Sequence, residues 1–158
     1  MNINSVLVAS NLPNIFYSLK GDIEEIMKFC IEKDILFYHI DGRKVNSDIE
    51  FFELAKILFA FPERTGDSWD AFFDRMRNAP WDQGAYMDDP KNGMVVVYSD
   101  FQQLALLDPD AIRRACGNFW AISEWKKEKY NYHVFFILIG DISTLSAGAQ
   151  EDIIAFGL

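Results

Sequence analysis

Two aspartates spaced four residues apart are the side chains of this chain best suited to chemistry. Asp70 and Asp74 lie in the run Asp67–Met76, and at about 100° per residue in a helix their side chains fall about 40° apart. Asp67 lies beside them, and Phe73 lies on the boundary of the same face. A like-charge pair at this spacing costs a helix about 0.2–0.5 kcal/mol, and neither aspartate is followed four residues later by a lysine or arginine. The face therefore carries uncompensated negative charge.

Three interpretations of this acidic face stay open on the residues alone. The simplest is a solvated face, favoured by the helix N-terminus and partly balanced by Arg77. The second is an anionic recognition surface beside an aromatic side chain. The third is acid–base catalysis by Asp70 and Asp74, with Glu124 as a further carboxylate, in a cleft that separates their pKa values. The exposed side of a helix is a poor place for such a cleft.

The residues around the aspartates predict the helix that must position them. Pro62 ends the preceding helix, Gly66 supplies a turn, and Asp67 or Ser68 caps the new helix, which begins near Ser68. The apolar residues that follow recur with the helical period and predict one core-facing stripe. They are Trp69, Phe72, Phe73 and Met76.

Composition and charge limit the classes of function. The chain has 158 residues, 50% of them hydrophobic and 15% aromatic, which is enough for one domain with a substantial core. The formal net charge of −9 opposes direct binding of nucleic acid or an anionic membrane and favours a basic partner. No apolar run approaches the roughly 18 residues of a membrane-spanning helix, and the amino terminus lacks the pattern of a signal peptide.

The two cysteines give no disulfide framework. Cys30 lies in an apolar helical pattern and Cys116 precedes Gly117. Buried thiols in a reducing compartment are the expectation for a lone pair in a chain of this size. The sequence therefore predicts a cytoplasmic protein, and it gives no indication of oligomeric state.

Three nearly continuous apolar runs are typical of buried strands, at residues 35–40, 94–98 and 133–139. Helical patterns separate them, which predicts an α/β fold with a small, mainly parallel three-stranded sheet packed by helices on both faces. An extra amino-terminal strand at 5–9 and a helix from Ile23 to about Lys33, capped by Asp22, precede this core. We predict a single domain over residues 1–158, with an accessory segment at 1–34 and a core at 35–140.

The remaining helices are predicted from their caps. Ser47 and Glu50 form a capping box before a helix that reads as largely buried. Short helices are expected at 101–107 and from Asp108-Pro109 to Gly117, and Asn118 is expected to cap another.

The loop from Ala79 to Gly93 mixes acidic residues with Trp81 and Tyr86. Loops of this length inside compact domains are often functional. Two interpretations stay open here: a binding loop beside the acidic helix, and an ordinary surface excursion pinned by Trp81.

Other kinds of site lack support in the sequence. His39 and His133 lie in or at the edge of predicted strands, without further residues at metal-ligand spacing, so we expect structural roles and no metal. No glycine-rich phosphate cradle follows a strand, and no serine or cysteine has the setting of a catalytic nucleophile. We therefore predict neither a cofactor nor an enzymatic activity.

The segment from Phe61 to Met76 resembles the barstar family of ribonuclease inhibitors, in its longer form with an extra amino-terminal segment. The family pattern is a proline, two residues that are often aromatic, a glycine, then Asn-Trp or Asn-Leu followed by Asp-Ala-aromatic-aromatic-Asp. The residues in those places here are Pro62, Gly66, Trp69, Asp70, Ala71, Phe72, Phe73 and Asp74. The match extends more loosely to about 120 residues, including the predicted strands at 35–42 and 94–98 and the segment 119–139.

The resemblance implies a non-catalytic inhibitor, of the immunity or antitoxin type, whose carboxylates take the place of RNA phosphate in the active site of a small, basic, secreted ribonuclease or related toxin. By position, Asp74 is the central anion, Asp70 its neighbour and Phe73 the flanking aromatic. Glu124 matches an acidic residue on the family's last helix, and Trp81 matches an aromatic in the loop after the acidic helix. The turn and cap residues Gly66, Asp67 and Ser68 complete the expected binding region.

Two departures from the family pattern affect the expected partner. Ser68 replaces the common asparagine, which a capping serine tolerates. Arg64 and Thr65 replace the aromatics before the glycine, and an arginine that faces a basic nuclease is unfavourable. A different toxin partner, a non-inhibitory interaction domain on the same fold and a carboxylate hydrolase therefore remain alternatives.

Overall fold

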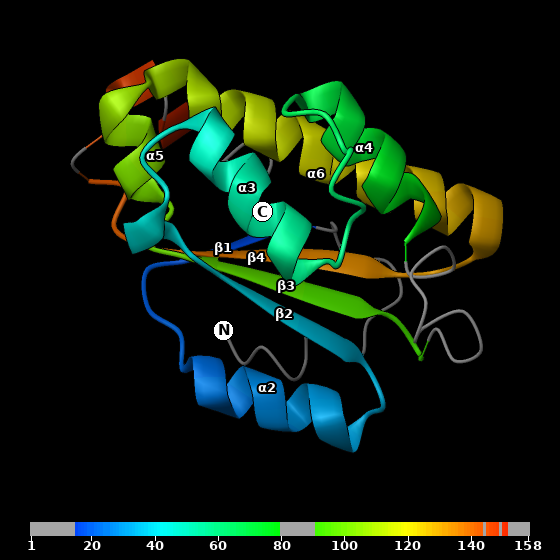
Figure 1. The fold of residues 1–158 in the computed structure, drawn as a ribbon. Helices are drawn as coiled ribbons and strands as arrows, with labels where there is room; N and C mark the ends of the chain where they lie inside the picture. The colour runs from blue at the N-terminus through cyan, green and yellow to red at the C-terminus, as the bar shows by residue number, and fades with distance from the viewer. Residues whose placement is uncertain (1–14, 80–90, 144, 149, 152–158) are drawn as a thin grey trace.

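Four parallel strands form a sheet at the centre of the molecule (Figure 1). The computed structural model describes residues 15–79, 91–143, 145–148 and 150–151. The strands are β1 (Ile15–Ser18), β2 (Leu36–Asp41), β3 (Met94–Ser99) and β4 (Val134–Ile139). They stand in the order β1-β4-β3-β2, and each neighbouring pair is parallel.

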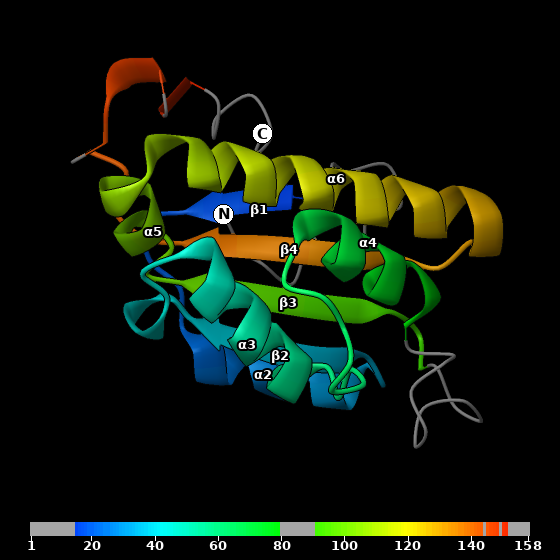
Figure 2. The same ribbon diagram turned by 45° about the horizontal axis from the view of Figure 1, so that its top comes forward.

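Helices cover both faces of this sheet (Figures 1 and 2). One face carries α2 (Ile23–Glu32). The other carries α3 (Asp48–Leu58), α4 (Trp69–Asn78), α5 (Gln102–Leu107) and α6 (Pro109–Tyr130), and a short 3-10 turn, η1 (Gly42–Lys44), follows β2. The predicted α/β fold with a small parallel sheet packed by helices is therefore confirmed.

The sheet has four strands where the sequence predicted three in the core. The additional strand is β1, which pairs with β4 in the register Ile15↔Phe136. The strand expected at residues 5–9 lies outside the described residues. The amino-terminal helix is present as α2, and the Asp22 side chain caps it by accepting from the Glu25 backbone N–H at 3.1 Å.

The burial of each strand follows from its place in the sheet. Every residue of β3 and β4 is buried, because helices pack against both faces of the sheet. The edge strand β2 alternates between buried and half-buried residues. Of the three apolar runs in the sequence, those at 94–98 and 133–139 thus mark the two central strands, and the run at 35–40 marks the edge strand β2.

The two faces of the sheet have separate cores. The smaller core lies under α2 and includes Ile26, Cys30, Val95 and Ile137. Burial raises the pKa of the Cys30 thiol to about 11, and Cys116 is also buried, in the larger core. The expectation of buried thiols is confirmed.

Aromatic rings centred on Phe51 fill the larger core. Phe51 is fully buried, and its ring lies 4.9 Å from the Trp69 ring and 5.3 Å from the Phe72 ring, centroid to centroid. It also contacts Tyr98 of β3 and Phe119 of α6 at about 6 Å. One side chain of α3 thus contacts α4, α6 and the sheet.

The prediction of two helices in the region of α6 is wrong. Two helices were expected, one ending at Gly117 and one capped by Asn118, but α6 runs through both residues. A side chain at Gly117 would meet nothing within 4 Å, and the Asn118 side-chain amide donates to the Arg114 carbonyl one turn earlier, at 2.9 Å, instead of capping a helix. Asn131, in the left-handed conformation, ends the helix instead.

The prediction that α3 is largely buried was only partly correct. Ile49 and Ile57 are 58% and 81% exposed, so the helix has a wet side that includes apolar residues. Its start is as predicted, because the Glu50 backbone N–H donates to Ser47 Oγ at 3.2 Å. The Glu50 carboxylate accepts from the Asn46 backbone N–H, one residue before the cap.

A close approach between two strand ends fixes the turn after β2. A Cβ added to Gly42 would lie 2.3 Å from the Ser99 carbonyl oxygen, so only glycine fits there.

His39 Nε2 lies 2.9 Å from Ser99 Oγ, a hydrogen bond that joins β2 to β3. Burial lowers the pKa of His39. The structure gives this histidine a partner within the sheet, as expected for a structural role.

We expect Phe51→Ala to destabilise the fold by about 3–5 kcal/mol, because it opens a cavity among at least four rings. Ile57→Ala serves as the control, since Ile57 is 81% exposed and its removal should cost less than about 0.5 kcal/mol. Urea unfolding followed by circular dichroism measures both. Similar losses for the two variants would contradict the central place of Phe51.

The ion pair after β2 predicts a dependence of stability on pH. The Arg43 guanidinium donates to both carboxylate oxygens of Asp41, at 2.8 and 2.9 Å, and lowers the pKa of that carboxyl from 3.8 to about 2. A depressed pKa in the folded state adds stability above pH 3.8 that is lost as the pH falls toward 2. Arg43 is largely exposed, so the contribution is small.

Asp41→Asn should therefore be less stable than the wild type at about pH 5, with a difference that shrinks by about pH 2.5. Glu32→Gln, at an exposed carboxylate on α2, controls for the change in net charge. Urea unfolding at both pH values measures the difference. A difference that stays constant between them would rule out this assignment.

Candidate functional site

The start of α4 is built by its cap. Ser68 has an extended backbone, and its hydroxyl accepts from the Ala71 backbone N–H at 3.1 Å, so the helix begins at Trp69 as predicted. Loss of such a cap costs about 1 kcal/mol. The buried side chains Phe72 and Met76 hold the inner face of the helix against the core. The cap and the apolar stripe that the sequence predicted are both present.

Gly66 does not make the turn that precedes α4. The turn lies at Glu63 and Arg64, where the Thr65 backbone N–H donates to the Pro62 carbonyl at 2.8 Å. A Cβ added to Gly66 would lie 3.5 Å from the Ala71 Cβ, which is ordinary contact. The expectation that Gly66 supplies the turn is wrong, because neither its place nor its surroundings require glycine.

Trp69 fastens the first turn of α4 to α3. Its ring lies 4.9 Å from Phe51 and 5.0 Å from Phe52. Its indole N–H donates to Asp48 Oδ2 at 3.3 Å, and Arg114 of α6 donates to the same oxygen. The helix that carries the aspartates is therefore tied to both of its neighbours.

Asp70 and Asp74 lie exposed on the outer face of α4, one turn apart. The Asp74 side chain is 66% exposed, and its Oδ1 lies 3.5 Å from an Arg77 guanidinium nitrogen. Phe73 is half-buried and packs against the larger core at the boundary of this face. The predicted stacking of the two carboxylates beside an aromatic is present.

Asp67 is held differently from the other two aspartates. Its carboxylate pairs with Lys56 of α3, which the spacing along the chain did not predict. The pair ties the segment before α4 back to the end of α3. The charge of Asp67 is therefore balanced by Lys56, whereas Asp70 has no ion pair among the described residues.

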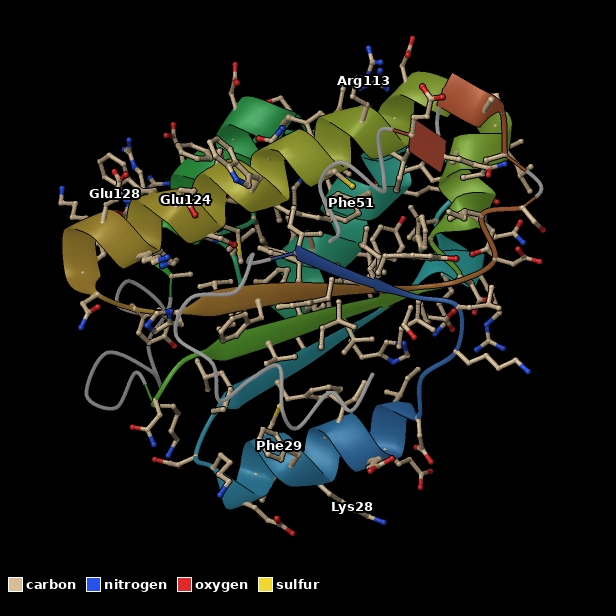
Figure 3. All side chains as sticks on the ribbon, turned by 180° about the vertical axis from the view of Figure 1, so that it is seen from behind. Lys28, Phe29, Phe51, Arg113, Glu124 and Glu128 are labelled. Carbon is tan, nitrogen blue, oxygen red and sulfur yellow. The ribbon has the colours of Figure 1, made fainter. Side chains whose placement is uncertain are left out.

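Glu124 lies on α6, a different helix from the one that carries Asp70 and Asp74. Ser123 donates to the Val134 carbonyl of the sheet, and the Trp125 ring contacts Arg77 of α4 at 5.1 Å. Successive side chains of a helix point about 100° apart. Glu124 therefore points neither toward the sheet, as Ser123 does, nor in the direction of Trp125. It shares α6 with Glu128 (Figure 3). Trp81, the other residue expected at the site, lies outside the described residues.

Lys126 is the residue near the site whose role sequence reasoning missed. Its side chain is fully buried, and its ammonium group donates to the backbone carbonyls of Arg77, at 3.3 Å, and of Ala79. These carbonyls belong to the end of α4, where helices leave acceptors unpaired and where cations are favoured. Lys126 is one of three lysines close together in the sequence, with Lys127 and Lys129. Nothing in the sequence indicated that its side chain is the buried one.

The described residues contain no group of three or more histidine, cysteine, aspartate or glutamate side chains that could hold a metal ion. Within the same part of the chain, no helix is long and apolar enough to cross a membrane.

The sequence matches a protein-family model. The model, described as Barstar (barnase inhibitor), covers residues 35–137. The chain belongs to the barstar family. The matched range runs from β2 into β4 and contains every residue predicted for the site, whereas β1 and α2 precede it.

A solved structure outside this family description has a related fold. A chain in the "Structure of Drosophila ORC bound to DNA" aligns with a TM-score of 0.53 and 16% sequence identity over 82% of the present chain. The alignment covers 32% of that longer chain, so the likeness concerns the fold alone. No curated protein matches the sequence.

In this barstar-family chain, Lys126→Met should destabilise the fold by about 1–3 kcal/mol, because it leaves carbonyls at the end of α4 without a donor. Lys129→Met, at an exposed lysine one turn later, should change the stability by less than about 0.5 kcal/mol. Thermal and urea unfolding compare the two variants. A stable Lys126→Met variant would show that α4 does not depend on the buried cation.

Proposed function

We propose that this barstar-family chain is an inhibitor of the immunity or antitoxin type, which binds and blocks a small basic ribonuclease or related toxin without catalysis. The exposed pair Asp70 and Asp74 on α4 carries the proposal. Both carboxylates face solvent on a helix whose other side is fixed by Trp69, Phe72 and Met76. A rigid pair of anions can occupy a site that binds RNA phosphate with little loss of conformational freedom on binding.

The charge of the chain supports a basic partner. A net charge of −9 attracts a cationic protein over distances longer than direct contact and raises the association rate. The effect falls as salt screens the charges. Salt-sensitive association therefore belongs to this proposal, whereas an interaction domain that binds through apolar surface should be much less sensitive.

The exposure of the two aspartates argues against the hydrolase alternative. A carboxylate that acts as a general acid near neutral pH needs an environment that disfavours its charge. The Asp74 side chain is 66% exposed, not enclosed in an apolar cleft, and it lies beside Arg77. The arrangement suits recognition of cations better than proton transfer.

The other residues have supporting places in the proposal. Phe73 offers an apolar contact beside the aspartates, Ser68 fixes the start of the helix, and Asp67 is partly neutralised by Lys56. Glu124 and Trp81 remain proposed contacts that follow from the family pattern. The buried cysteines Cys30 and Cys116 support a reducing compartment, and we propose the cytoplasm.

The experiment is affinity capture from the culture and lysate of the source organism, with three baits: the wild type, Asp70→Ala/Asp74→Ala and Glu24→Ala/Glu32→Ala. The third bait removes two exposed carboxylates from α2, so it matches the change in net charge. We expect a small basic nuclease or toxin to be held by the wild type and the α2 variant and lost from the α4 variant. The dissociation constant of the captured protein should rise at least about a hundredfold on loss of both aspartates.

Two further outcomes decide against the proposal. Equal capture by all three baits would move binding to another surface. Capture of a nuclease that is not inhibited by the wild type, in an assay of RNA cleavage, would leave an interaction domain without inhibitory function. Circular dichroism and unfolding of the α4 variant verify that it is folded, as expected because alanine is a good helix former.

A further inference from the structure

A pocket of about 330 Å³ lies between the outer face of α4 and the segment that leads into it. That segment connects the end of α3 to the start of α4 (Figure 2). It contributes Arg64, Thr65 and Gly66 to the lining, and α4 contributes Asp74, Arg75 and Arg77. The volume is at the lower end of the range of about 300–1,000 Å³ that is usual for small-molecule sites.

The charges in this pocket are mostly positive, although the chain as a whole is acidic. Three guanidinium groups and one carboxylate line it, which leaves a net of two positive charges. Asp74 pairs with Arg77, at 3.5 Å. Neither Arg64 nor Arg75 forms an ion pair within the described parts of the chain. Two guanidinium groups from different segments therefore face one pocket with their hydrogen-bonding capacity free for a ligand.

A buried hydroxyl in the wall of the pocket gives an independent observation. Thr65 is 7% exposed, and its Oγ1 has no hydrogen-bond partner among the described residues. Buried polar groups are normally paired, so an orphaned one marks a site where a partner is missing. Thr65 also lines the pocket, so this unpartnered hydroxyl belongs to a residue of the pocket wall. Gly66, next in the chain, leaves the backbone uncovered at the same place.

Arg77 is held in a fixed position near the pocket. Its guanidinium lies 5.1 Å from the centroid of the Trp125 ring on α6, and it also contacts Asp74. An arginine held by a ring and a carboxylate loses less freedom when it binds a further group. The pocket therefore combines one preorganised cation with two available ones.

We propose that this pocket binds the phosphate group of a small phosphate monoester, held by Arg64 and Arg75, with Arg77 and the Thr65 hydroxyl as further donors. Phosphate suits the pocket because its charge at neutral pH of about −1.5 to −2 balances the net positive charge, and its oxygens accept from several guanidinium groups at once. A carboxylate offers two oxygens and a single charge. The inference does not depend on the proposed inhibition, since its ligand-binding groups are arginines and a hydroxyl, although Asp74 belongs to both the pocket lining and the proposed inhibitory pair.

The test is a nuclear magnetic resonance titration of the ¹⁵N-labelled chain with inorganic phosphate and with phenyl phosphate, at constant ionic strength. The signals to follow are the Nε–Hε groups of the arginines and the backbone amides of Thr65 and Gly66. We expect saturable shifts confined to these signals. Arg64→Gln/Arg75→Gln should weaken the affinity at least about tenfold, whereas Arg113→Gln on α6 (Figure 3) should leave it unchanged.

Three results would overturn the inference. The first is a set of shifts that fails to saturate or is matched by chloride at the same ionic strength. The second is an affinity for phosphate that the Arg64→Gln/Arg75→Gln variant retains, provided that its spectrum elsewhere shows an intact fold. The third is acetate binding as tightly as phosphate, which would make the pocket a carboxylate site. None of these results bears on capture by the Asp70→Ala/Asp74→Ala bait, so the two proposals fail separately.

Discussion

The packing of aromatic rings between α3, α4, α6 and the sheet is the constraint on which the rest of the structure depends. Phe51 lies at its centre, and Phe119 of α6 stacks on Phe136 of β4 with centroids 4.3 Å apart and planes within 7°. Trp69 joins the same group from the first turn of α4. The outer face of α4 is thus oriented by contacts on its inner face, and a loosened ring contact would turn or tilt the carboxylates.

The charges on α4 are arranged within this frame. Asp70 and Asp74 lie on the outer face, while arginines occupy the second half of the helix and the segment before it. A partner would therefore meet a surface that is negative at one place and positive beside it. Such a dipolar pattern selects orientation as well as charge, since a purely cationic surface would be attracted by the aspartates and repelled by Arg64 and Arg75.

The sequence predicted much of the fold because its signals were local. The buried strands were visible as apolar runs, and the starts of α2, α3 and α4 were visible as the capping residues Asp22, Ser47 and Ser68. The error at Gly117 shows the limit of local signals, since glycine inside a helix reads as a stop unless the packing of α6 is known. The exposure of Ile57 could not be predicted either, because an apolar side chain alone does not indicate whether its face of the helix packs against another element.

The candidate site was predictable only where it is continuous in sequence. The spacing of Asp70, Phe73 and Asp74 placed them on one helix without any tertiary information. The partners of the neighbouring groups come from other helices. Lys56 pairs with Asp67, Trp125 contacts Arg77, and Lys126 donates to the carbonyls at the end of α4. Periodicity could not show that Arg64 returns to α4 beside Arg75, because this follows from the path of the connecting segment.

The position of β1 has a consequence for how the molecule behaves in concentrated solution. β1 pairs with β4 from Phe136 to Ile139, and so it occupies backbone donors and acceptors on that side of β4. Within the residues that the structure describes, the outer edge on this side is β1, four residues long. A short edge strand is a poor template for a strand of another molecule. The strand β1, which precedes the region shared with the family, thus disfavours edge-to-edge aggregation on this side of the sheet.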